Sequence, residues 1–140
     1  MIARRSVLAG GLVVAAWPAL ATPREVEVEV AKLTGDKILQ PGHVTLDLAQ
    51  MVENGNAVSV IVSASPPAGR TVASLHVFAE GNPNPEVLHA AFGPASYAPK
   101  VATRMRLATS QTVVAVAVMD DGSCWTDSVS VIVTLAACLE

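Results

Sequence analysis

The sequence predicts an all-β fold, an antiparallel β-sandwich, from two patterns and the composition. Short runs in which valine alternates with other residues recur along the chain, as expected of half-buried strands. Gly, Pro, Asn and Asp separate these runs at intervals typical of a sandwich. Aromatic residues make up only 4% of the chain, whereas valine, a strand-forming residue, is abundant. The pattern requires no helix of useful length.

The expected strands follow one another from the first valine run to the C-terminal region. The first is 25–30, where valines alternate with glutamates, and one helical turn is expected at 49–53. The nearly continuous apolar run 112–119 indicates a central strand packed on both faces, and the Asp120-Asp121-Gly122 segment after it indicates a tight hairpin turn. The remaining strands are expected at 44–48, 58–63, 72–78, 87–92, 101–107 and 124–135.

The first 21 residues have the pattern of an export signal. A charged segment with the pair Arg4-Arg5 precedes an apolar stretch, 9–17, that is too short to span a bilayer. Ala19-Leu20-Ala21 resembles a signal-peptidase cleavage site, and the arginine pair suits the twin-arginine (Tat) route. We therefore expect residues 1–21 to be a signal peptide, residues 22–140 to form one mature domain, and the protein to be periplasmic.

The charge of the chain excludes some classes of partner. The formal net charge is −3, and removal of Arg4 and Arg5 with the signal leaves −3 − 2 = −5. Nucleic-acid binding needs a basic face, so nucleic acid is not expected as a partner. No other segment is long and apolar enough to cross a membrane, so no membrane association is expected after the signal is removed.

The two cysteines are expected to be free thiols with different roles. Cys124 and Cys138 flank the last expected strand, and about ten intervening strand residues span about 33 Å. A disulfide requires Cα atoms within about 7 Å, so an internal bridge would need a sharp bend or an exchange between chains. Cys124 is expected in the core or at the turn. Cys138 is the third residue from the C-terminus, where chains are usually exposed, and is the reactive candidate.

Four segments, taken in order along the chain, carry a family resemblance: 52–58 (VENGNAV), 78–83 (FAEGNP), 102–111 (ATRMRLATSQ) and 121–125 (DGSCW). They resemble the SoxY family, the sulfur-carrier subunits of the thiosulfate-oxidising Sox system. The resemblance covers essentially the whole mature chain and is strongest from Phe92 to Trp125.

The resemblance implies an immunoglobulin-like sandwich, a Tat signal and a periplasmic heterodimer with a SoxZ-like subunit. It also implies that Cys138 is the covalent sulfur carrier, because the family places this cysteine third from the end of a Gly-Gly-Cys-Gly-Gly tail. SoxXA, SoxB and, where present, SoxCD would act in turn on the bound sulfur as transient partners. The chain itself would be a carrier without a cofactor and not an enzyme.

The tail departs from the family pattern on both sides of the cysteine. Ala136 and Ala137 replace the two preceding glycines, and Leu139 and Glu140 replace the two that follow. Side chains narrow the backbone freedom that glycine allows, and a carboxylate beside a thiol disfavours the thiolate. Two alternatives therefore stay open: a divergent SoxY paralogue that no longer carries sulfur, and an immunoglobulin-like scaffold module in which Cys138 makes only an intermolecular disulfide.

Other candidate site residues give weaker signals. Arg104 and Arg106 share the outward face of an expected strand and could form a solvated charged face or contact an anion or a partner. His43, His76 and His89 lack the spacing of metal ligands, and no Cys-x-x-Cys motif is present, so no metal site is expected. His76 lies in the middle of an expected strand and is interpreted as a hydrogen-bonded structural residue.

Overall fold

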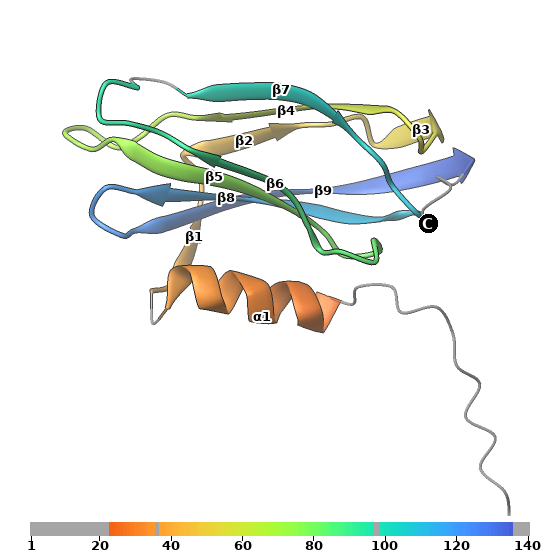
Figure 1. The fold of residues 1–140 in the computed structure, drawn as a ribbon, viewed down its shortest axis with the longest axis horizontal. Helices are drawn as coiled ribbons and strands as arrows, with labels where there is room; N and C mark the ends of the chain where they lie inside the picture. The colour runs from red at the N-terminus through yellow and green to blue at the C-terminus, as the bar shows by residue number, and fades with distance from the viewer. Residues whose placement is uncertain (1–22, 36, 97–98, 136–140) are drawn as a thin grey trace, which may run out of the picture.

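A computed structural model describes residues 23–35, 37–96 and 99–135 of the chain (Figure 1). Residues 1–21, expected to be a signal peptide, and Cys138 lie outside the described residues. The elements are α1 (Pro23–Thr34), β1 (Leu39–Pro41), β2 (Val44–Asp47), β3 (Met51–Asn54), β4 (Val58–Ala64), β5 (Val72–Ala79), β6 (Glu86–Ala91), β7 (Lys100–Met105), β8 (Gln111–Met119) and β9 (Cys124–Leu135).

The strands form two layers, so the predicted sandwich is confirmed. One sheet has six strands in the order β1-β9-β8-β5-β6, with β3 also paired to β9, and the other has three in the order β2-β4-β7. Figure 1 shows the smaller sheet stacked on the larger one. The pairs of β8 with β5 and with β9 are antiparallel, as are both pairs of the smaller sheet.

The core lies between the two sheets and is built almost entirely from small aliphatic side chains. β4 contributes alternate valines, and β8 contributes Val113, Ala115, Ala117 and Met119 from the opposite layer. This alternation follows from the period of two in a strand, which directs every second side chain to the same face. β8 lies between β5 and β9 and is buried on both faces, which confirms its predicted central position.

The segment expected as the first strand is a helix, so the prediction for 25–30 was wrong. Val26 and Val30 are four residues apart, and on a helix both face the sheet, where the buried Val26 packs with Phe78 and Val116. An alternating run places valines at positions i and i+4 as well, so it satisfies both periods. The helix covers the outer face of the larger sheet (Figure 1).

Local signals favour this helix at both of its ends. Pro23 stands at the first position, where its missing N–H has no cost, and Glu25 lies in the first turn, where an acidic residue complements the helix dipole. Lys32 lies in the last turn and pairs with Glu29 at 3.0 Å. Gly35 has φ 61° and donates its N–H to the carbonyl of Ala31, which ends the helix with the left-handed residue that glycine readily adopts.

Two short strands along β9 also differ from the expectation. Residues 51–54 form β3, not part of a helical turn, and Leu39–Pro41 form β1, which the sequence pattern did not indicate. Both pair with β9 in parallel, β1 along its first residues and β3 along its last, so the larger sheet is mixed and not purely antiparallel. These strands cover the free edge of β9, which would otherwise expose unpaired backbone groups.

Candidate functional site

The candidate site is the end of the sandwich at which β9 stops, here called the β9 end. Cys138 follows the last described residue of β9, Leu135, by three positions and itself lies outside the described residues. The β9 end is formed by three loops: 55–57 between β3 and β4, 80–85 between β5 and β6, and 106–110 between β7 and β8. Each of these loops overlaps one of the segments that resemble the SoxY family.

The last residues of β9 are tied to these loops by hydrogen bonds. The N–H of Gly55 donates to the carbonyl of Leu135 at 2.8 Å, and the hydroxyl of Thr134 donates to the carbonyl of Glu53 at 3.1 Å. The N–H of Val133 donates to the hydroxyl of Ser110 at 2.8 Å. Hydrogen bonds to the neighbouring segments therefore fix β9 as far as its last described residue, Leu135.

A buried asparagine joins two of the loops. Asn82, only 5% exposed, donates from its side chain to the carbonyl of Arg106 at 2.8 Å and accepts from the N–H of Ala108 at 2.9 Å. Its carbonyl oxygen also accepts from the side-chain amide of Gln111 at 3.1 Å. These bonds satisfy buried backbone groups that turn away from any strand partner.

Gly81, the neighbour of Asn82, allows the loops to approach closely. The N–H of Gly81 donates to the side-chain oxygen of Gln111 at 2.8 Å. A Cβ atom at this position would lie 2.9 Å from the methyl group of Thr109 and 3.1 Å from the Cβ of Gln111. The Gly81-Asn82 pair and its partners in 106–111 therefore form one packed unit.

Arg104 and Arg106 lie together beside this unit. Arg104 is on β7, Arg106 is one residue beyond its end, and both side chains line an open groove of about 360 Å³ with the 82–84 loop and the first residues of β6. Both residues are exposed, and none of the ion pairs found among the described residues includes either one. Two guanidinium groups and one carboxylate, that of Glu86, line this groove, so its net charge is positive on an acidic protein.

Cys124 lies at the start of β9, at the opposite end of that strand from the candidate site. The structure confirms that it is a free, buried thiol, with its Sγ 3.3 Å from the carbonyl oxygen of Gly122. Burial raises the pKa of the Cys124 thiol, which Lys37 partly offsets and Asp121 reinforces. A higher pKa means less thiolate, so this cysteine is poorly suited to sulfur chemistry.

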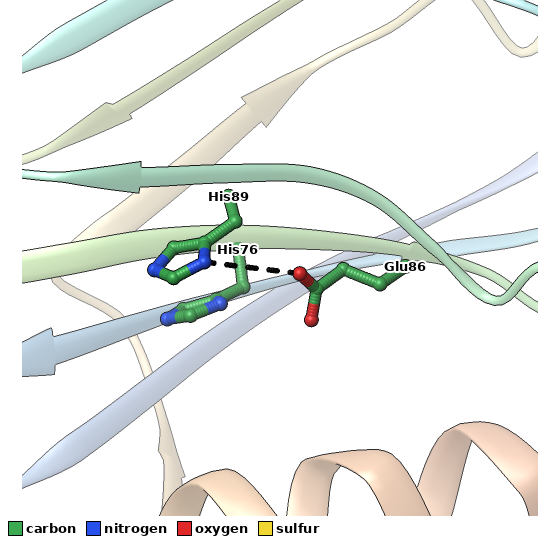
Figure 2. Close-up of side chains that lie close together, drawn as sticks. All are labelled: His76, Glu86 and His89. Carbon is green, nitrogen blue, oxygen red and sulfur yellow. Dashed lines mark ion pairs between the residues drawn. The ribbon is translucent and has the colours of Figure 1, made fainter.

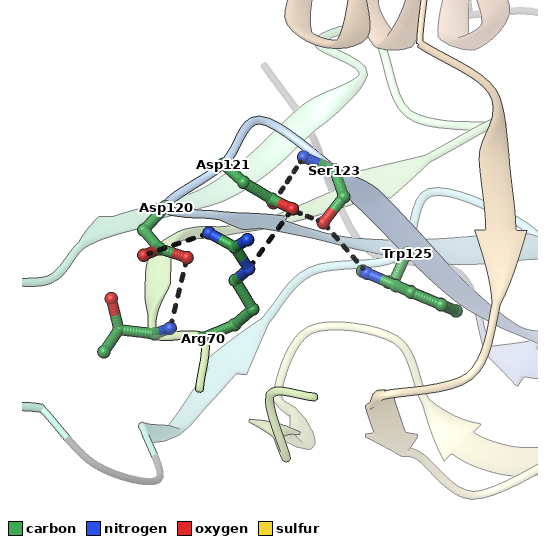
Figure 3. A network of polar contacts seen from close by, with 6 residues as sticks. Arg70, Asp120, Asp121, Ser123 and Trp125 are labelled. Atoms are coloured by element: carbon green, nitrogen blue, oxygen red, sulfur yellow. Dashed lines mark hydrogen bonds and ion pairs between the residues drawn. The ribbon is translucent and has the colours of Figure 1, made fainter. Parts of the chain in front are cut away.

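The hairpin that carries Cys124 is fixed by a polar network (Figure 3). Asp121 accepts from the hydroxyl of Ser123 at 2.6 Å and from the Ser123 N–H at 3.0 Å, and Arg70 lies 3.5 Å from its other oxygen. The indole N–H of Trp125 donates to the Ser123 hydroxyl at 3.4 Å. The predicted Asp120-Asp121-Gly122 turn is confirmed.

A third group of polar side chains lies on the helix-covered face of the larger sheet. His76 of β5 and His89 of β6 are cross-strand neighbours whose rings stack with centroids 4.4 Å apart, and Glu86 lies 3.9 Å from His89 (Figure 2). The predicted hydrogen bond of His76 is confirmed, since its Nε2 lies 2.8 Å from the hydroxyl of Ser74. Burial and the neighbouring His89 lower the pKa of His76 to about 4.

The histidine spacing along the chain did not indicate this group, because strand pairing brings its members together. If 72–78 and 87–92 are taken as paired strands, the two histidines can be placed opposite each other only when the register of that pair is known. The sequence likewise did not indicate the bonds of Asn82, which join loops far apart in the chain.

Among the described residues, no helix is both long enough and apolar enough to cross a membrane.

A family model described as "Sulfur oxidation protein SoxY" matches residues 30–138, most of the chain. A search of curated proteins found no match. Among solved structures, the chain is similar to the sulfur carrier protein SoxY from Chlorobium limicola f thiosulfatophilum, with a TM-score of 0.69 and 25% identity. That similarity covers 80% of this chain and 98% of the other.

Two superoxide reductases share the fold at lower identity. The enzyme from Nanoarchaeum equitans has a TM-score of 0.53 and 8% identity, covering 67% of this chain and all (100%) of its own. A neelaredoxin from Ignicoccus hospitalis has a TM-score of 0.50 and 19% identity, covering 80% of this chain and 92% of its own. At these identities the likeness concerns the sandwich alone.

Proposed function

Because the chain belongs to the SoxY family of sulfur carrier proteins, we propose that Cys138 holds thiosulfate-derived sulfur covalently for partner enzymes. The carrier takes up the sulfur group on its thiolate and presents it, while the chemical steps belong to the partners. The family match extends to residue 138, so the cysteine lies within the matched region.

The observation that carries this proposal is the contrast between the two ends of β9. Cys124 is buried at one end with a raised pKa, whereas the other end is tied down up to Leu135, three residues before Cys138. Three residues span at most about 11 Å, so the Cys138 backbone stays within that reach of the β9 end. A short arm on a rigid base can present a thiol to an enzyme without loss of the fold.

The proposal includes the setting in which the carrier works. Residues 1–21 direct export, by the Tat route, to the periplasm, where a SoxZ-like subunit binds the carrier as a heterodimer. SoxXA, SoxB and, where present, SoxCD are its transient partners. Arg104 and Arg106 contact an anion or one of these partners, since their groove lies beside the β9 end and neither is held in an ion pair within the described residues.

The tail favours one second candidate, a paralogue that has kept the sandwich but does not carry sulfur. Alanines replace the glycines before Cys138, and Leu139 and Glu140 follow it. The bulk of Leu139 restricts entry of the tail to a narrow enzyme channel, and the carboxylate of Glu140 repels an anionic substrate such as thiosulfate.

Reconstituted thiosulfate oxidation tests the proposal against this candidate. The mature protein with its SoxZ-like partner and the Sox enzymes should oxidise thiosulfate, and Cys138→Ser should abolish the activity. Cys124→Ala is the matched control, since it removes the buried thiol and should leave turnover largely intact. Equal activity of the wild-type protein and Cys138→Ser would favour the non-carrier paralogue.

A further inference from the structure

We propose that His76, Glu86 and His89 form a binding site for a divalent first-row transition-metal ion, typified by Zn²⁺. This group lies on the helix-covered face of the larger sheet, although Glu86 also lines the groove of Arg104 and Arg106, and the proposal does not depend on the carrier function. Each of the three residues offers one ligand atom, and these atoms all lie within 4.8 Å of one another. Figure 2 shows the two imidazole rings side by side, with the Glu86 carboxylate facing them.

The strongest support is a buried ring nitrogen without a partner. His76 is 3% exposed, and its Nδ1 is buried and makes no hydrogen bond among the described residues. Buried polar atoms are nearly always satisfied, so an orphaned acceptor of this kind indicates a group that would bind there. A metal ion would supply the missing partner.

The other ring nitrogen of His76 is held as a metal ligand requires. Nε2 lies 2.8 Å from the Ser74 hydroxyl, which can accept its proton, and the proton is then absent from Nδ1. Metal-binding histidines commonly donate their second N–H in this way, which fixes the tautomer and the ring orientation. Ser74 is therefore a positioning residue for the site.

The remaining two ligands can adjust around this fixed one. The side chains of His89 and Glu86 are 55% and 40% exposed, so solvent space surrounds them. Ligand atoms about 2.0–2.2 Å from a Zn²⁺ ion lie nearer one another than the observed limit of 4.8 Å, and a change of side-chain rotamer can close the difference. Strand pairing already places His76 opposite His89.

The donor set selects the class of ion. Two imidazole nitrogens and one carboxylate suit Zn²⁺, Cu²⁺ or Ni²⁺ better than Mg²⁺ or Ca²⁺, which prefer oxygen ligands alone. Three protein ligands leave a fourth tetrahedral position for water.

Calorimetric titration of the mature protein with Zn²⁺ tests the site. The titration uses the Cys138→Ser form, because a tail thiolate would itself bind the ion. One equivalent should bind, and Co²⁺ should develop the intense visible absorption of a tetrahedral site. His89→Gln should lower the affinity by at least about 100-fold, since loss of even an outer partner of a ligand costs 10–100-fold.

Two further variants separate a metal site from a general effect of histidine loss. His43→Asn removes a histidine outside the group and should leave binding unchanged; Ser74→Ala should weaken binding about 10-fold and alter the Co²⁺ spectrum. The His89 and Glu86 side chains are solvent-accessible, so their variants are expected to fold. Absence of a one-to-one complex, or equal affinity in His89→Gln, would overturn the proposal.

Discussion

At the scale of single residues, Asn82 organises the end of the sandwich from which the tail leaves. Its one side chain satisfies the carbonyl of Arg106, the N–H of Ala108 and the amide of Gln111. The side chain of Gln111 strengthens the same junction, since it accepts from the N–H of Gly81 and donates to the carbonyl of Thr109. An apolar substitute for Asn82 would leave its partner groups buried without partners.

Asn82→Ala should lower the free energy of unfolding by about 3 kcal/mol, since each unsatisfied buried group costs about 1–3 kcal/mol. Asn84→Ala, at an exposed position in the same loop, should change it by less than about 0.5 kcal/mol. Urea denaturation measures both variants. Equal effects of the two substitutions would contradict the role assigned to Asn82.

His76 should make stability depend on pH in a defined window. Its pKa is lowered from 6.5 to about 4 by burial and by His89, so between these values the unfolded chain binds a proton that the folded protein does not. The free energy of unfolding is therefore unaffected by titration of His76 above pH 6.5. It falls by up to about 3 kcal/mol as the pH is lowered from 6.5 towards 4.

Denaturation at pH 7.5 and 4.5 in the presence of a chelator measures this loss. Carboxylates titrate over the same range, so the comparison is with His76→Asn, whose stability should fall less between the two pH values. If the wild-type protein and His76→Asn lost the same free energy, the perturbed histidine would not be the cause.

At the scale of elements, α1 shows why sequence patterns predict some segments and not others. Strands β2, β4, β5, β8 and β9 are predicted at nearly their observed positions because burial on one or both faces imposes their pattern directly. The 25–30 run satisfies two periods, and the choice depends on what it packs against, here Phe78 and Val116. Phe78 and Val116 lie more than forty residues beyond this run along the chain, so a local pattern cannot include them.

Two valine substitutions distinguish the helix from the expected strand. On the helix, Val26 is buried against the sheet and Val28 is 48% exposed, whereas on a strand both would share one face. Val26→Ala should cost about 1–2 kcal/mol of unfolding free energy. Val28→Ala should change it by less than about 0.5 kcal/mol. Similar losses in both variants would favour the strand.

The tail is the element on which the rate of the proposed carrier depends. Replacing Ala136-Ala137 and Leu139-Glu140 by glycines should raise turnover with the Sox enzymes several-fold, because glycine widens the backbone freedom of the arm. Restoring only Glu140 in that variant should reduce turnover again if its charge matters. Unchanged turnover in the glycine variant would mean that the natural tail does not limit the reaction.

At the scale of the whole molecule, the two sheets of the sandwich enclose one core, and the proposed carrier residue follows the last strand. The fold class could be predicted from the alternating valines, because the inner faces of two sheets need regularly spaced apolar residues. That Cys138 is the reactive thiol could be predicted from its place near the chain end, whereas a carrier role for it could be proposed only by resemblance, since spacing alone does not specify the chemistry of a terminal cysteine. The His76–His89 pairing and the loops around Asn82 depend on register and on tertiary contacts.

The central claim is that a sulfur group becomes covalently attached to Cys138. The direct measurement is the intact mass of the protein isolated from the periplasm without reductant, during growth on thiosulfate. We predict a sulfur-containing adduct that reductant removes and that is absent from Cys138→Ser but present in Cys124→Ala. An unmodified Cys138 after exposure to thiosulfate and the Sox enzymes would contradict the claim.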